Sequence, residues 1–273
     1  MFVAGLARAG TTVLMRELYG TNAFRSLTYR DMPFLLAPNT WGRVSRPARV
    51  SKAASERAHG DGILVDFDSP EALEEVFWRV HRGSAYIRSD RLLPMDSDAD
   101  LEADFVDYVA LLVRESEAKR YLSKNNNNIL RLETLARVFP EATIIIPFRE
   151  PAAQASSLLQ QHRRFLARHS EDKFSRDYMS WLVHHEFGQD HRPFIFNDAQ
   201  HAELGNYDPA EDLGYWLRLW TNVYRRTLAS APGNFLFVSY ERLCDQTEEV
   251  WPALCDRLDL PIQSPLPSMR RSQ

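Results

Sequence analysis

Residues 2–14 read FVAGLARAGTTVL: a short apolar stretch, a loop with two glycines, and the start of a helix. Gly5 and Gly10 stand at the spacing G-x-x-x-x-G, and Thr11 and Thr12 follow the second glycine. Glycines let backbone N–H groups approach an anion, and the positive end of the helix dipole adds to the attraction. The stretch is therefore typical of a phosphate-binding loop between a strand and a helix. The alternative is an ordinary strand–turn–helix junction with incidental glycines.

The loop differs from the phosphate loop of kinases and ATPases at one position. There, a lysine after the second glycine reaches the β- and γ-phosphates, and the next hydroxyl binds the metal ion. Here Thr11 occupies the lysine position, and the cation of the loop is Arg8. A phosphosulfate group needs no bridging Mg²⁺, so a fixed cation beside it would be enough. A nucleotide kinase or NTPase is the alternative function, but no convincing metal-binding Asp follows an apolar strand.

Apolar stretches alternate with helical patterns along the whole chain. Residues 143–148 (TIIIPF) form a β-branched run, which is typical of a strand buried on both faces of a parallel sheet. The other expected elements are strands at 24–27, 120–123 and 235–239, and helices at 11–19, 71–81, 101–112, 129–139, from Pro151, 171–187, 209–230 and 241–258. This alternation predicts an α/β fold with a doubly wound, mostly parallel sheet flanked by helices.

We expect one domain over residues 1–273, with residues 38–100 and 160–230 as helical or irregular insertions on the acceptor side of the site or over it. In doubly wound sheets the site lies at the carboxyl ends of the strands. The first strand is short, which predicts that the natural chain begins a few residues before Met1.

A second candidate phosphate site follows the strand at 143–148. Arg149 stands at the carboxyl end of that strand, and Ser157 lies about two turns into the helix that begins at Pro151. The guanidinium of the arginine and the hydroxyl of the serine can together bind a phosphate. The alternative makes Arg149 a salt-bridging loop residue and the serines part of a helix-packing surface.

The two motifs together resemble those of the sulfotransferases that use PAPS (3′-phosphoadenosine 5′-phosphosulfate). The first signature of that family reads roughly P-[RK]-S-G-T-T, and residues 7–12 read ARAGTT; the second reads R-[DN]-P with a serine on the next helix, and here it is REP followed by Ser157. The resemblance implies transfer of a sulfuryl group from PAPS to a hydroxyl acceptor, with release of PAP. It implies that the 3′-phosphate is held by Arg149 and Ser157, and the 5′-phosphosulfate by Arg8, Ala9, Gly10, Thr11 and Thr12.

The resemblance extends over most of the chain. Residues 124–157 look especially like the tyrosylprotein sulfotransferase branch and its bacterial relatives, where a lysine precedes L-x-x-L-x-x-x-F-P-[DE]-A and then a strand. Residues 235–260, with VSYERL, match the usual family ending. The departures are Ala7 and Ala9 for Pro and Ser, and Glu150 for Asp or Asn; none of them removes the cation or the backbone N–H groups.

Sulfuryl transfer needs cations near the leaving oxygen and a base for the acceptor proton. The candidate cations are Arg8 and Lys124, since Lys124 ends a short strand and matches a lysine that family members use in catalysis. The candidate base is Asp31, because related enzymes place a catalytic Glu about this far beyond the phosphate loop, and His185 is a second choice. The alternatives are a solvated loop lysine at 124 and an Asp31 that pairs with Arg30 or caps a turn.

Composition narrows the possible partners and location. The formal charge of −4 and the pI near 6.1 argue against a nucleic-acid binder. No apolar segment approaches the ~20 residues of a membrane span, and the N-terminus does not resemble a signal peptide. We therefore expect a cytoplasmic protein in which Cys244 and Cys255 are reduced.

No metal ion is expected, because the cluster His184, His185 and His191 matches no zinc-site spacing. The acceptor can be a sugar, a small molecule or a protein tyrosine, since all present a hydroxyl. A further alternative is a catalytically inactive protein that binds PAPS or PAP.

Overall fold

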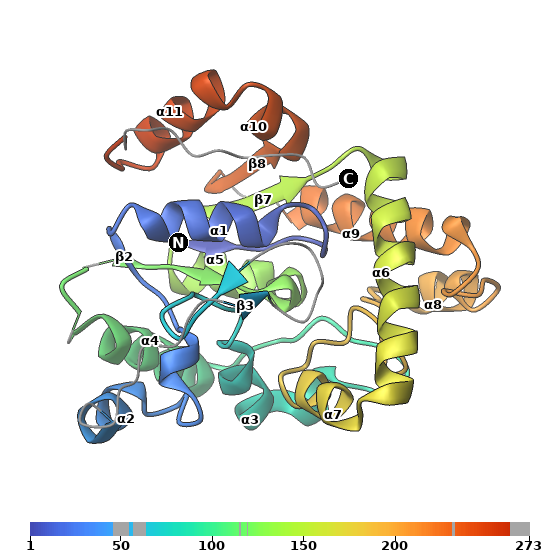
Figure 1. The fold of residues 1–273 in the computed structure, drawn as a ribbon, viewed down its shortest axis with the longest axis horizontal. Coiled ribbons are helices and arrows are strands. Elements are labelled where there is room, and N and C mark those ends of the chain that lie inside the picture. Colours follow the sequence, from blue (N-terminus) through green and yellow to red (C-terminus); the bar gives the residue numbers. More distant parts are fainter. Residues whose placement is uncertain (46–54, 57–63, 115, 119, 231–232, 263–273) are drawn as a thin grey trace.

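The computed structural model describes residues 1–45, 55–56, 64–114, 116–118, 120–230 and 233–262. Its central sheet has four parallel strands in the order β6-β1-β7-β8. Figure 1 shows β7 beside β8. These strands are β6 (Ser123–Lys124), β1 (Phe2–Val3), β7 (Ile144–Phe148) and β8 (Phe235–Ser239). The predicted α/β fold with a parallel sheet is confirmed.

A smaller parallel sheet, formed by β2 (Phe24–Arg25) and β5 (Arg120–Tyr121), continues the central one. The N–H of Leu122 donates to the carbonyl of Arg25 (3.0 Å), and the N–H of Ser123 donates to the carbonyl of Met1 (3.1 Å). Residues 120–124 thus run first along β2 and then along β1. The strand predicted at 120–123 is present, but its two halves pair with different neighbours.

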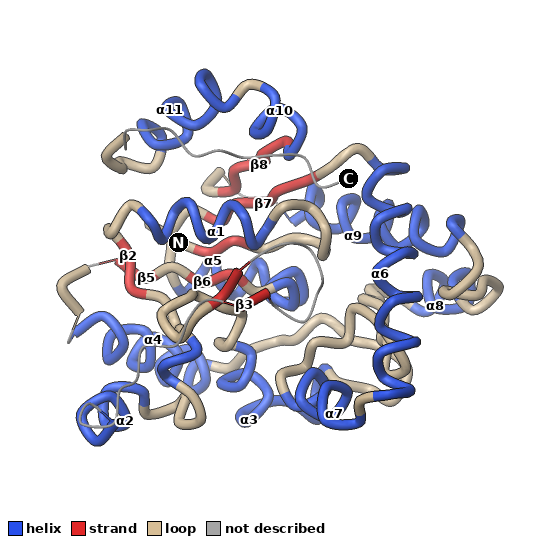
Figure 2. The backbone as a smooth tube through the Cα atoms, viewed as in Figure 1, coloured by secondary structure: helices blue, strands red, loops and turns tan. Residues whose placement is uncertain are grey.

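Helices cover both faces of the sheet (Figure 2). Val3 and Ile145 point into an apolar cluster with α1 and α11, whereas Phe2 and Ile144 point into a larger cluster on the opposite face, because side chains alternate along a strand. The helices are α1 (Thr11–Gly20), α2 (Pro38–Ser45), α3 (Glu75–Tyr86), α4 (Ala99–Arg114), α5 (Leu132–Val138), α6 (Pro151–Glu171), α7 (Lys173–Trp181), α8 (Asp198–Leu204), α9 (Leu213–Ser230), α10 (Tyr240–Asp245) and α11 (Thr247–Arg257).

The helix predicted over residues 171–187 is present only as α7, and its extension past Trp181 is wrong. Helix α6 continues to Glu171, α7 ends at Trp181, and residues 182–197 run as an irregular segment. Val183 has φ of 59° and Gly188 has φ of 79°, and neither value fits a right-handed helix. A β-branched residue adopts such a conformation only when tertiary contacts fix it, and Val183 is fully buried.

Other boundaries also shift. The predicted helix at 71–81 is α3 at 75–86, the one at 129–139 begins as a 3₁₀ turn (Asn126–Arg131), and the one at 241–258 divides at Gln246. The hairpin of β3 (Ser55–Glu56) and β4 (Leu64–Val65) lies within the predicted insertion at 38–100, of which residues 46–54 and 57–63 fall outside the described part. No helix of the described residues is long and apolar enough to cross a membrane.

Candidate active site

The residues expected at the site follow four neighbouring strands. Lys124 ends β6 and pairs in register with Val3 of β1, the glycine loop follows β1, Arg149 follows β7, and Tyr240 follows β8. Because all four strands are parallel, their carboxyl ends meet at one edge of the sheet. The two motifs and Lys124 therefore lie along one edge, as the sequence predicts.

The glycine loop takes a left-handed conformation at two residues. Arg8 has φ of 66° and Gly10 has φ of 85°. For an arginine this conformation costs about 1–2 kcal/mol, so packing must hold it in place. A methyl group at Gly10 would lie 2.4 Å from a ring carbon of Tyr240, so only glycine fits there. Gly10 is also the N-cap residue of α1 and has no side chain to occupy the helix start, which is the arrangement that binds anions.

Arg8 and Ser157 are in direct contact. The Nε of Arg8 donates a hydrogen bond to the Oγ of Ser157 over 2.9 Å. The cation of the first motif and the hydroxyl of the second, far apart in the chain, thus belong to one polar cluster.

Gln154 connects the loop to α6, although no motif in the sequence predicts this contact. Its Nε2 donates to the carbonyl of Ala7 (2.9 Å), and its Oε1 accepts from the indole N–H of Trp220 (3.0 Å). Gln154 is fully buried and lies one turn before Ser157, on the same face of the helix. That spacing was the only signal in the sequence that pointed to this residue.

Arg149 is held from two sides by the start of α10. Its guanidinium lies over the ring of Tyr240 (5.2 Å), and its Nε is 3.9 Å from the Oε1 of Glu241. This distance is too long for a hydrogen bond, so the contact orients the arginine through its charge. The salt-bridge alternative is therefore met in part, and the phosphate role stays a prediction.

Glu150 has a local structural role that explains its departure from the family pattern. Its carboxylate accepts from the N–H groups of Ala152 (3.1 Å) and Ala153 (2.6 Å) and so caps α6. These hydrogen bonds hold the pKa of Glu150 below its usual value. A longer acidic residue thus performs the capping role usually taken by Asp or Asn.

Lys124 is buried, with 6% of its surface exposed, which excludes the alternative of a solvated loop lysine. The four asparagines after it are also buried. The Oδ1 of Asn125 accepts from the N–H of Asn127 (3.0 Å) and begins the 3₁₀ turn, while the Nδ2 of Asn126 donates to the Oε1 of Glu186 (2.7 Å). Glu186 was missed, because it lies within residues 171–187, which were expected to be helical.

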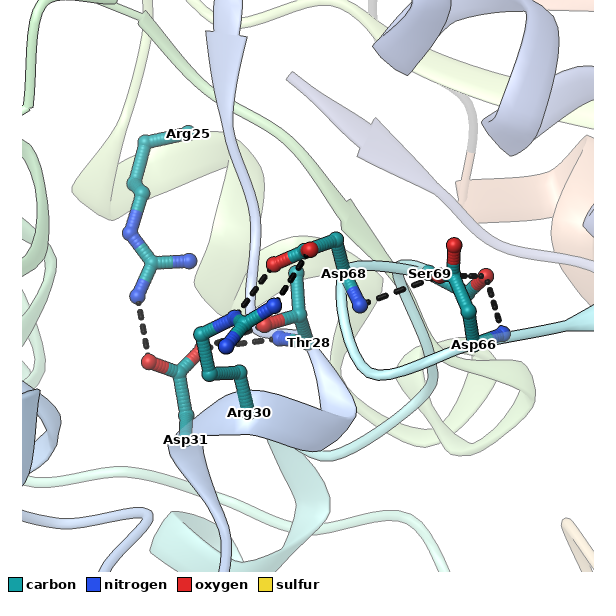
Figure 3. Close-up of polar contacts among 7 residues, drawn as sticks. All are labelled: Arg25, Thr28, Arg30, Asp31, Asp66, Asp68 and Ser69. Atoms are coloured by element: carbon teal, nitrogen blue, oxygen red, sulfur yellow. Dashed lines mark hydrogen bonds and ion pairs between the residues drawn. The ribbon is translucent and has the colours of Figure 1, made fainter. Parts of the chain in front are cut away.

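Asp31 lies in a short 3₁₀ turn (Tyr29–Asp31) after β2 (Figure 3). Strand β2 pairs with residues 120–121, whereas β1 pairs with residues 123–124. Its Oδ1 is 2.8 Å from the Nη2 of Arg25, and its Oδ2 accepts from the N–H (2.8 Å) and the hydroxyl (3.2 Å) of Thr28. Figure 3 shows that Arg30 instead donates two hydrogen bonds to the carboxylate of Asp68. Pairing with Arg30 is therefore wrong, and Asp31 does cap a turn. A carboxylate has about four acceptor positions, so these contacts leave one for a further partner.

Two histidines of residues 182–197, His185 and His191, are neutral in the fold. The Nδ1 of His185 donates to the carbonyl of Asp190 (2.9 Å), and the Nε2 of His191 accepts from the hydroxyl of Tyr215 (2.7 Å). Burial lowers the pKa of His185 to about 4 and that of His191 to about 3. In the part of the chain that the structure describes, no three His, Cys, Asp or Glu side chains gather to hold a metal ion.

The comparison with protein families agrees with this geometry. A model of the sulfotransferase family matches residues 1–202 of the 273. The chain therefore belongs to the sulfotransferase family. No curated protein matches it.

A solved structure of a bacterial sulfotransferase shares the fold. The sulfotransferase STF9 from Mycobacterium avium aligns over 97% of this chain and 64% of its own length, with a TM-score of 0.51 and 16% identity. The sulfotransferase from Alicyclobacillus acidocaldarius aligns over 100% and 85%, with a TM-score of 0.46 and 15% identity. The chain thus spans less than two thirds of the Mycobacterium avium protein. At this identity the likeness is one of fold.

Proposed function

We propose that the protein transfers a sulfuryl group from PAPS to a hydroxyl acceptor and releases PAP. The observation that carries this proposal is the hydrogen bond between Arg8 of the glycine loop and Ser157 of the second motif, which unites two anion-binding elements in one site. Membership of the sulfotransferase family supports PAPS as the donor. The kinase alternative is disfavoured because Thr11, a residue without charge, begins α1 where a kinase has its lysine.

Each candidate residue has a place in the proposed reaction. The acceptor oxygen bonds to sulfur while the bond from sulfur to the bridging phosphate oxygen breaks, so negative charge develops on PAP and the acceptor proton leaves. Arg8 and Lys124 stabilise that charge. Asp31 takes the proton through its remaining acceptor position, and His185 is the second choice of base. Arg149 and Ser157 hold the 3′-phosphate, and residues 8–12 hold the 5′-phosphosulfate.

The finer assignments are part of the same proposal. The likeness of residues 124–157 supports a place near the tyrosylprotein sulfotransferase branch and its bacterial relatives. The acceptor is then a protein tyrosine, a sugar or a small alcohol, the reaction needs no metal ion, and the protein works in the cytoplasm.

Thermal unfolding with nucleotides tests the donor. A ligand that binds only the native state at 100 times its Kd stabilises it by about 2.7 kcal/mol. PAP should therefore raise the Tm clearly, and ATP with Mg²⁺ far less. Equal stabilisation by ATP would refute the proposal. Sulfur-labelled PAPS incubated with cell extract then identifies the labelled acceptor, whereas an inactive PAP-binding protein would be stabilised by PAP but label nothing.

A further inference from the structure

Glu186 lies beside the glycine loop although its own segment carries no family motif. It lines a crevice together with Leu6 and Ala7 of the loop and with Trp216 and Leu219 of α9. Most of the described residues that line this crevice are apolar, and Glu186 is the one carboxylate among them. An acidic side chain in such surroundings needs specific partners.

The partners of Glu186 come from its own segment and from the turn after β6. Its Oε1 accepts from the Nδ2 of Asn126 (2.7 Å), its Oε2 is 3.7 Å from the Nδ1 of His184, and its side chain is 11% exposed. Burial by itself would raise the pKa of Glu186. The hydrogen bond and charge of His184, the charge of Lys124 and the Asn126 hydrogen bond outweigh burial and hold this pKa below its usual value. Glu186 is therefore ionised, and Lys124 is one of the reasons.

The interaction between two opposite charges is mutual. Burial disfavours a protonated lysine, and a nearby carboxylate restores the charged form. Lys124 is almost fully buried, so a loss of its charge would leave it unable to stabilise a developing anion.

We propose that Glu186 is a positioning residue: Asn126 fixes its carboxylate beside the turn that ends β6, and there the carboxylate keeps the Lys124 ammonium charged. This inference rests on the proposed function, in which Lys124 stabilises charge on the leaving oxygen. Asn126 follows Lys124 by two residues, so the turn that ends β6 carries both the cation and the anchor of its counter-ion.

Four neighbouring groups do not replace Glu186 in this role. His185 and His191 interact electrostatically with Glu186 from the same segment, but burial keeps both neutral. Arg192 lines the same crevice but carries the same charge as Lys124. Glu75 approaches the same turn through the Nδ2 of Asn125, but its carboxylate is paired with the buried Arg131 (2.8 Å). Of the carboxylates compared, Glu186 is the one whose pKa the charge of Lys124 lowers.

The pKa of Lys124 tests the inference directly. The chain has four lysines, Lys52, Lys119, Lys124 and Lys173, so protein labelled with ¹³C-lysine gives few Cε signals. The Lys124 signal is the one lost in Lys124→Arg. In Glu186→Gln the pKa of Lys124 should fall by about one unit or more, the usual effect of an opposite charge in contact. Glu186→Asp, which keeps the charge, should retain part of that difference.

The matched control is Asp190→Asn, in the same segment, because the carboxylate of Asp190 pairs with Arg176 (2.7 Å). It should leave the pKa of Lys124 unchanged. An unchanged pKa of Lys124 in a folded Glu186→Gln variant would overturn the inference. If that variant does not fold, Glu186→Asp decides instead. The pKa of Lys124 should then lie below its wild-type value, and an unchanged value would overturn the inference. The titration needs neither PAPS nor acceptor. A failure of PAP to stabilise the protein would refute the proposed function and leave this result standing.

Turnover provides a second readout once an acceptor is known. Glu186→Gln should lower kcat by about tenfold, leave the KM for PAPS nearly unchanged, and move the alkaline limb of the pH profile to lower pH. In a Lys124→Ala background the same substitution should have no further effect, because residues that act as a unit are not additive. Additive losses in this double-mutant cycle would overturn the inference.

Discussion

Arg149→Ala should weaken PAP binding strongly, because it removes the charged fork assigned to the 3′-phosphate. A hydrogen bond to a charged group contributes about 1.5–3 kcal/mol, which corresponds to about a 10- to 150-fold loss of affinity. We expect the upper part of this range. The Oε1 of Glu241 lies 3.9 Å from the Nε of Arg149, so the substitution also leaves a carboxylate near the phosphate without its counter-ion.

Calorimetric titration with PAP at fixed ionic strength measures this loss. Arg163→Ala is the control, because Arg163 lies on α6 and bonds to the carbonyl of Ala210 (2.6 Å) and to Glu211. Its PAP affinity should equal that of the wild type. Ser157→Ala should lose less, about 1 kcal/mol for a neutral hydroxyl. Wild-type affinity in a folded Arg149→Ala variant would show that the second motif does not bind the 3′-phosphate.

Four further outcomes are expected. Gly10→Ala should lower the Tm and remove the stabilisation by PAP, because the added methyl group would lie 2.4 Å from the ring of Tyr240 and the φ of Gly10 is 85°. Thermal unfolding with and without PAP measures both effects. An unchanged stabilisation by PAP would contradict the assignment of the loop to the phosphosulfate. Asp31→Asn should lower kcat by about 10²–10⁴-fold with little change in PAP affinity, and a rate within a few-fold of wild type would remove Asp31 from the role of base. Stability should fall as the pH drops from 6.5 towards 4, because the pKa of His185 is lowered to about 4 and that of His191 to about 3. In this pH range the unfolded chain takes up protons that the native state does not. Urea unfolding at pH 7 and pH 5 measures the loss of stability, and His185→Gln should make that loss smaller. EDTA should leave turnover unchanged, and a loss restored by Mg²⁺ would favour a kinase.

The sequence predicted the parts of the site in which the local motif also sets the local structure. Gly10 is needed both for its left-handed φ and for the close approach of Tyr240, so a short motif was enough to place it. Lys124 and Arg149 were placed because each stands at the carboxyl end of an expected strand, and parallel strands end at one edge. For Asp31 the sequence suggested Arg30 as a partner, and only the structure shows that the partner is Arg25.

The residues that were missed depend on contacts between distant parts of the chain. Gln154 looks like an ordinary helical residue until its amide is seen to join Ala7 to Trp220. Glu186 was missed because a helical pattern was extended past Trp181, and nothing local announces the positive φ of Val183. Tertiary packing overrides helical propensity after Trp181. Because the helix ends there, Glu186 reaches the turn after β6 and contacts Asn126.

The amide of Gln154 has a consequence for protein engineering. Trp220 belongs to the segment 160–230, which we expect on the acceptor side of the site. An attempt to change the acceptor could therefore exchange this segment between relatives. Through Gln154 the same tryptophan supports the carbonyl of Ala7 in the glycine loop. A chimera with a different residue at position 220 would therefore also have a lower affinity for the donor, unless position 154 is exchanged together with position 220.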